Sequence, residues 1–122
     1  MNLLKEAKIY YQKAIKEFEE AKRNNDKLRI QDACAKAWLG VIKATEALFL
    51  RKGVNKSELP KTDRGRKVFL RRYGNRELRR MFSSMRDNLH IHGYYDNLVE
   101  FDELPEYLDD VKEYIERIEN FK

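Results

Sequence analysis

Apolar residues recur every three or four positions along nearly the whole chain, which is the spacing of one face of an α-helix. The first half predicts two long helices. One follows Asn2 and stops at the turn-forming residues 24–26, and the next follows Asp26 and stops at Gly53. Asn2 and Asp26 are residue types whose side chains cap the first turn of a helix.

The second half predicts one short and two longer helices after a loop over residues 53–60. The short helix runs from about residue 63 to 73, and Gly74 closes it. Asn75 caps the next helix, whose pattern Gly93 interrupts before a polar, aromatic loop over residues 94–100. Asp102, with Pro105 in the first turn, opens the last helix.

No segment alternates apolar and polar residues with a period of two, so we expect no sheet. The pattern predicts an all-α fold: an up-and-down four-helix bundle with one additional short helix, in a single domain over residues 1–122. No apolar run reaches the length of a membrane span, and residues 1–11 lack the apolar stretch of a signal peptide. We therefore expect a cytoplasmic protein with no membrane partner.

Charge is distributed unevenly along the chain. Residues 1–50 carry a net charge of +3, residues 51–86 carry +10, and residues 87–122 carry −8. Arginine outnumbers lysine nine to four in the central segment, which favours phosphate because guanidinium binds it through two hydrogen bonds. We expect an RNA backbone to follow the central arginines Arg71, Arg72, Arg76, Arg79 and Arg80.

The alternative is that these arginines pair with the acidic last helix, within one chain or across an oligomer. Phe69 and Tyr73 lie among the arginines and are candidates for stacking on bases. The acidic candidates are Asp109, Asp110, Glu113, Glu116 and Glu119. From the sequence, both interpretations of the basic segment are open.

Both histidines follow Arg86 closely. Arg86 and His90 are four apart and share a helix face, and His92 can turn back beside them if the helix ends near Ile91. An arginine that holds a phosphate and a histidine that exchanges a proton near neutral pH suit RNA cleavage without a metal. The alternative is that the histidines only interact with the C-terminal end of a helix. His90 and His92 diverge on a helix and no third ligand is near in sequence, so we expect no metal site.

The segment from Arg86 to Asp96 resembles the motif of the HEPN superfamily (higher eukaryotes and prokaryotes nucleotide-binding domain). That motif is an Arg, four to six residues and a His, followed in one subgroup by any residue and a Tyr. Arg86, five intervening residues, His92, Gly93 and Tyr94 match it, whereas His90 leaves only three intervening residues. The Ala-rich second helix and its terminal Gly53 are also similar to the family.

The resemblance implies a homodimer in which two motif helices meet, and a metal-independent endoribonuclease of toxin–antitoxin or defence type. Arg86 would hold the phosphate, His92 would be the general acid and base with His90 as second choice, and Asp87 and Asn88 would be polar supports. It implies no cofactor. In the subgroup paired with a nucleotidyltransferase antitoxin, the motif Tyr is modified, and Tyr94 holds that place, with Tyr95 as a competitor. The alternative function is a non-catalytic helical module that binds a nucleotide, RNA or a protein partner.

Overall fold

A computed structural model describes residues 2–122, and every regular element in that range is helical. The all-α bundle with an additional short helix is therefore confirmed. The long elements are α1 (Leu3–Asn24), α2 (Lys27–Arg51), α4 (Arg76–Met85) with its continuation η2 (Arg86–Tyr95), and α5 (Leu104–Asn120). The short elements are η1 (Lys56–Glu58) and α3 (Asp63–Tyr73).

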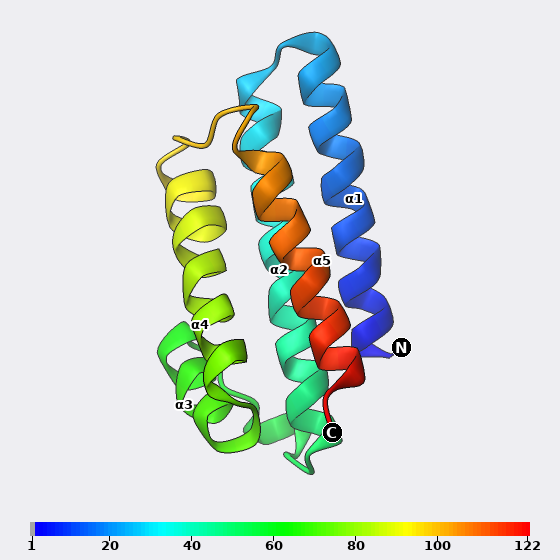
Figure 1. Cartoon of the computed structure of the whole chain (residues 1–122), viewed down its shortest axis with the longest axis vertical. Coiled ribbons are helices and arrows are strands. Elements are labelled where there is room, and N and C mark those ends of the chain that lie inside the picture. The colour runs from blue at the N-terminus through cyan, green and yellow to red at the C-terminus, as the bar shows by residue number, and fades with distance from the viewer. Residues whose placement is uncertain (1) are drawn as a thin grey trace.

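Helix α2 is the centre of the bundle, because it contacts α1, α3, α4, η2 and α5. Figure 1 shows α1, α2, α5 and the α4–η2 rod running lengthwise, with α3 beside the lower end of α4. Small buried residues let neighbouring helices approach α2 closely: Ala33, Ala37, Gly40 and Ala44. At Gly40 a side chain would lie 3.1 Å from the carbonyl oxygen of Ala7, so the contact between α1 and α2 requires a residue this small.

The predicted helix starts at Asn2, Asp26 and Asn75 are confirmed. The Oδ1 atoms of these residues accept hydrogen bonds from the backbone N–H groups of Leu4 (2.8 Å), Leu28 (3.0 Å) and Leu78 (2.8 Å). These bonds satisfy N–H groups that have no partner within the helix.

The prediction that Gly93 interrupts the fourth long helix is wrong. The helix continues to Tyr95 as the π-helix η2, whose wider turn places Asp96 N 2.9 Å from Ile91 O. Gly93 is buried against α2, where an added Cβ would lie 2.5 Å from Cys34 Sγ. The glycine is thus a point of close helix packing, which local sequence patterns cannot distinguish from a helix end.

The last helix begins slightly later than Asp102, the predicted opening residue. Its first residue is Leu104, preceded by Glu103, and Pro105 lies in the first turn as expected. The Glu103 carboxylate accepts a hydrogen bond from Glu100 N at 2.9 Å. This bond stabilises the turn before α5. The loop between η2 and α5 covers residues 96–103.

The core is apolar with one internal polar pair. Trp38 and Phe49 are buried, as the sequence predicts. The hydroxyl groups of Thr45 and Tyr114 lie 2.6 Å apart and satisfy each other. Burial raises the pKa of the Cys34 thiol to about 12, which keeps it protonated and unreactive at neutral pH.

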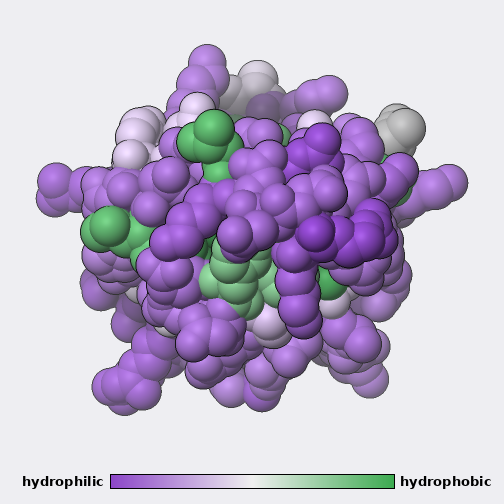
Figure 2. Space-filling view, turned by 90° about the horizontal axis from the view of Figure 1, so that it is seen from above, coloured by the Kyte–Doolittle hydropathy of each residue, from purple (hydrophilic) through white to green (hydrophobic). Residues whose placement is uncertain are grey.

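Polar residues cover most of the surface. Figure 2, a view down the bundle from the α1–α2 turn, shows hydrophilic side chains with small, separate apolar patches between them. Among residues 2–122, no helix combines the length and the apolar character that a membrane span requires.

Candidate nucleic-acid interface

One face of the α4–η2 rod carries polar groups. Arg79, Ser83, Arg86 and His90 follow one another at spacings of four, three and four, which places them on one side of the rod. The opposite side is buried in the bundle through Leu78, Phe82, Met85 and Leu89. Burial of the apolar side therefore fixes the direction of the polar side, which lies next to α3.

The guanidinium of Arg86 is held by a carboxylate from α3. Arg86 Nε lies 2.8 Å from Asp63 Oδ2, and Arg66 Nη1 lies 2.8 Å from Asp63 Oδ1. The Asp63 and Arg66 side chains are mostly buried, with 17% and 12% of their surface exposed. Asp63 thus orients both arginines, with one oxygen for each.

Sequence reasoning missed Asp63, which is 23 positions before Arg86. Its one local signal is an acidic residue in the first turn of a helix, which is common at any helix start. The packing of α3 on α4 creates the contact.

His90 lies next to this cluster. Its imidazole stacks on the buried Trp38, with ring centroids 5.4 Å apart and planes inclined by 20°. Burial lowers the pKa of His90, Asp63 opposes that shift, and the nearby Arg86 and Arg66 add to it. The imidazole is therefore uncharged at neutral pH and can accept a proton.

His92, the histidine that fits the family motif better, has different surroundings. Its ring is exposed, and its Nδ1 lies 3.8 Å from Asp96 Oδ2. It belongs to η2 and not to a loop, so it does not turn back toward Arg86 in the way the sequence suggested. Within residues 2–122, no hydrogen bond or ion pair joins Arg86 to His92.

The remaining residues of the motif segment lie nearby. The exposed Asp87 carboxylate is 3.9 Å from Arg86 Nη1. The Asn88 amide is 3.5 Å from Ser84 Oγ. Tyr94 is 40% exposed, and its backbone oxygen accepts a hydrogen bond from the Gln31 side chain at 2.5 Å.

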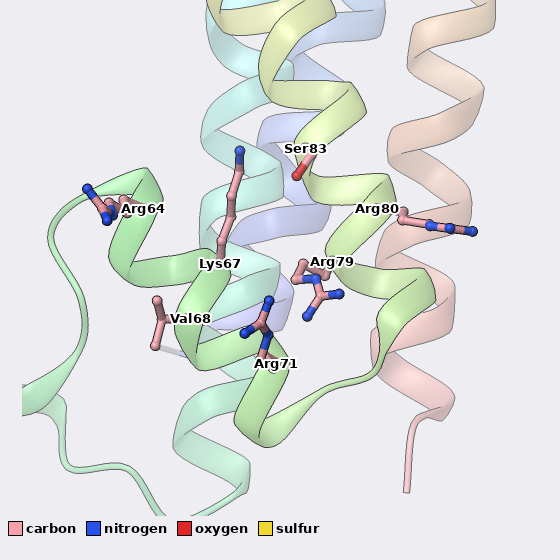
Figure 3. A pocket seen from close by; sticks show the side chains of 7 residues that line it. All are labelled: Arg64, Lys67, Val68, Arg71, Arg79, Arg80 and Ser83. Atoms are coloured by element: carbon pink, nitrogen blue, oxygen red, sulfur yellow. The ribbon is translucent and has the colours of Figure 1, made fainter.

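A basic groove of about 430 Å³ lies between α3 and α4 (Figure 3). Its lining residues are Arg64, Lys67, Val68, Arg71, Arg79, Arg80 and Ser83. Figure 3 shows Arg71 and Arg79 directed into the space between the helices and the Ser83 hydroxyl above them, whereas Arg80 extends toward α5. Five cations and one hydroxyl, with no carboxylate among the lining residues, make a surface that attracts anions.

Three of the five predicted RNA-binding arginines line this groove: Arg71, Arg79 and Arg80. Arg72 lies over the Phe69 ring, 6.0 Å from its centroid, and Arg76 is exposed at the start of α4.

Phe69 and Tyr73 do not line the groove, because they pack on the buried Phe49 with centroid separations of 5.4 and 6.2 Å. Lys67 and Arg64 belong to the groove through the spacing 64, 67 and 71, which marks one face of α3.

Within residues 2–122, no cation of the basic segment 51–86 forms an ion pair with a carboxylate of α5. The ion pair between α4 and α5 has the opposite polarity, with Arg117 of α5 2.9 Å from Glu77 of α4. Arg80 borders Asp110 and Glu113, but neither carboxylate lies within 4.0 Å of it. Burial and the neighbouring carboxylates of α5 raise the pKa of Asp110, as expected for an acid without a cation partner.

Within residues 2–122, no three His, Cys, Asp or Glu side chains converge as metal ligands. No family model, protein of established function or solved structure matches this chain. The function is therefore inferred from the site itself.

Proposed function

We propose that this protein binds RNA along the basic groove between α3 and α4. The observation that carries the proposal is the set of five cationic side chains that line the groove, none of which has a carboxylate of the described residues 2–122 within 4.0 Å. Within residues 2–122, Lys8 and Lys36 pair with carboxylates of a neighbouring helix, whereas none of the five groove cations forms an ion pair, so their charge is available to an external polyanion. Arginine suits phosphate because it donates two parallel hydrogen bonds.

Following the resemblance to the HEPN superfamily, we also propose that the protein acts as a homodimer through its motif helix. The dimer would bring two grooves to one RNA. Its mass in solution, measured by light scattering, tests this part separately from RNA binding.

The binding test is fluorescence anisotropy with a labelled RNA, over a salt range of about 50 to 200 mM. Replacing both Arg71 and Arg79 by Gln should lower the affinity at least about tenfold and reduce the salt dependence by up to one unit of slope for each lost phosphate contact. The matched control removes the same charge elsewhere, by Lys8→Gln with Lys36→Gln, because these lysines pair with Glu119 and Glu17. Equal losses in the two double variants would mean that only net charge matters, and the groove assignment would be wrong.

A second function, metal-independent RNA cleavage, is favoured by the arrangement of Arg86 and His90. Both lie on the polar face next to the groove, and the lowered pKa of His90 leaves a neutral imidazole that can take a proton from a 2′-hydroxyl. Arg86 would stabilise the charge that develops on the phosphate. His92, beside Asp96, is the other candidate for the acid and base.

The cleavage test uses RNA in the presence of a chelator, with detection of 2′,3′-cyclic phosphate ends. Arg86→Gln should abolish the product. His90→Gln and His92→Gln identify which histidine acts. Full activity in all three variants would show that these residues do not catalyse the cleavage, and absence of the product with wild-type protein would leave RNA binding without catalysis as the function.

The resemblance also suggests that a nucleotidyltransferase antitoxin modifies Tyr94. Its 40% exposure is compatible with access by an enzyme. Mass spectrometry of the protein incubated with such an enzyme and a nucleotide would test this, with Tyr94→Phe and Tyr95→Phe as the two diagnostic variants.

A further inference from the structure

Three aromatic rings cluster on η2, and we call His90, Tyr94 and Tyr95 the η2 ring cluster. The planes of His90 and Tyr94 are parallel to within 1°, with centroids 6.3 Å apart. Tyr95 meets both edge-on, at 4.9 Å from His90 and 5.3 Å from Tyr94. The three rings thus form a single aromatic surface.

This surface is open to solvent on one side and supported on the other. Tyr94 is 40% exposed and Tyr95 is 65% exposed, so burial in the core does not account for their aromatic character. Behind them, His90 stacks on Trp38, and Gln31 holds the Tyr94 backbone oxygen. Rings held in place before binding lose little conformational entropy when a ligand stacks on them.

The η2 ring cluster lies at the end of the basic groove. Ser83 lines the groove, Arg86 follows it by three positions and His90 follows Arg86 by four, all on the same side of the rod. The seven positions from Ser83 to His90 correspond to about 10 Å along the rod, which a short stretch of RNA backbone can bridge. The charges of Arg86, Asp63 and Arg66 all influence His90, which is consistent with this proximity.

We propose that the η2 ring cluster stacks on an unpaired base of single-stranded RNA whose phosphates lie in the basic groove. This inference rests on the proposed RNA binding and specifies its substrate class. Unpaired bases expose the faces that stack on aromatic side chains, whereas duplex bases already stack on one another. The protein therefore selects single strands, loops or ends over duplex RNA.

The test compares three ligands by anisotropy or competition: a single-stranded RNA of about ten nucleotides, the same strand annealed to its complement, and inorganic polyphosphate. The variant Tyr94→Leu with Tyr95→Leu keeps apolar bulk but removes the rings. It should weaken single-strand binding about 5- to 150-fold, from about 1–3 kcal/mol per stacked base, and leave duplex and polyphosphate binding unchanged. Tyr10→Leu, on α1 beside Lys13, is the matched control and should change none of the three.

The outcomes separate this inference from the function on which it rests. Wild-type protein that binds single-stranded and duplex RNA equally, or a double variant that weakens all three ligands alike or none of them, would overturn the stacking role and leave the groove intact. Wild-type protein that binds no RNA would overturn both. Circular dichroism of the double variant verifies that the helices are retained.

Discussion

The lysines that bridge α1 to its neighbours and the arginines of the α3–α4 groove differ in ion pairing. Where α1 packs beside α2 and α5, cations meet carboxylates of a neighbouring helix: Lys36 lies 2.9 Å from Glu17, and Lys8 lies 2.6 Å from Glu119. In the groove between α3 and α4, Arg71 and Arg79 have no carboxylate within 4.0 Å in the described part of the chain, although the acidic α5 packs on α4. Exposed ion pairs contribute little to stability, so leaving arginines unpaired costs the fold little and keeps one surface positive.

Asp63 is the exception within the α3–α4 side. It is a mostly buried carboxylate that holds Arg66 and Arg86, where the groove approaches His90. The contrast distinguishes two kinds of arginine: those that are fixed in place by Asp63 and those that are left available.

The largest effect is expected from Asp63→Asn. The substitution leaves Arg66, whose side chain is only 12% exposed, without a carboxylate and removes the nearer of the two carboxylates beside Arg86. It should lower the free energy of unfolding by about 3 kcal/mol. Urea unfolding measures the loss. Asp32→Asn, at an exposed position on α2 outside any ion pair, is the control and should change stability by less than about 0.5 kcal/mol. A loss at Asp63 no greater than that of the control would show that the arginines do not depend on it.

A smaller loss is expected from Gly93→Ala, which tests how η2 is attached to α2. The new Cβ would lie 2.5 Å from Cys34 Sγ and 2.7 Å from Cys34 Cβ, so one helix must shift, at a cost of about 2 kcal/mol. Adding Cys34→Gly removes both clashing atoms and should recover part of the loss relative to the sum of the single variants. Strictly additive losses in this double-mutant cycle would contradict the packing explanation.

The helix caps and Gly93 show what the local sequence can and cannot predict. The caps at Asn2, Asp26 and Asn75 were predictable because each bond joins residues two or three positions apart. The sequence wrongly predicts an interruption at Gly93, because a glycine at a helix end and a glycine under a crossing helix have the same local pattern.

The sequence predicts the local features of the candidate site but not the contacts between distant segments. Charge counting identified the basic segment, and the helical spacing of Arg79 and Arg86 indicates which side chains share a face. The pairing of Arg86 with Asp63 and the stacking of His90 on Trp38 join distant segments, so they follow from tertiary packing. The unpaired state of the groove also depends on where α5 lies, which no spacing along the chain encodes.

The difference between paired and available cations predicts opposite effects on stability. Arg71→Gln with Arg79→Gln should leave the free energy of unfolding unchanged or raise it by about 0.5 kcal/mol, because repulsion between like charges is relieved. Lys8→Gln with Lys36→Gln should lower it by up to about 1 kcal/mol, because two ion pairs are lost. High salt should shrink both effects by screening. A clear loss of stability in the arginine variant would mean that these side chains have structural partners.

The smallest effect concerns pH and the His90 imidazole. Burial lowers the pKa of His90 below its ordinary value of 6.5, so just below that pH the unfolded chain binds a proton that the native state does not. The free energy of unfolding should therefore fall as the pH drops from about 6.5 toward about 5, and the part of this slope that comes from His90 should vanish in His90→Phe.

Trp38 provides an independent readout of the same titration, because it is the single tryptophan of the chain and stacks on His90. Its fluorescence in the native state should change with a midpoint below pH 6.5, since a charged imidazole alters the surroundings of the indole. His92→Gln should leave this signal unchanged, because the exposed ring of His92 lies beside Asp96. A Trp38 titration that persists in His90→Phe and disappears in His92→Gln would reverse the assignment and make His92 the histidine that lies against the core.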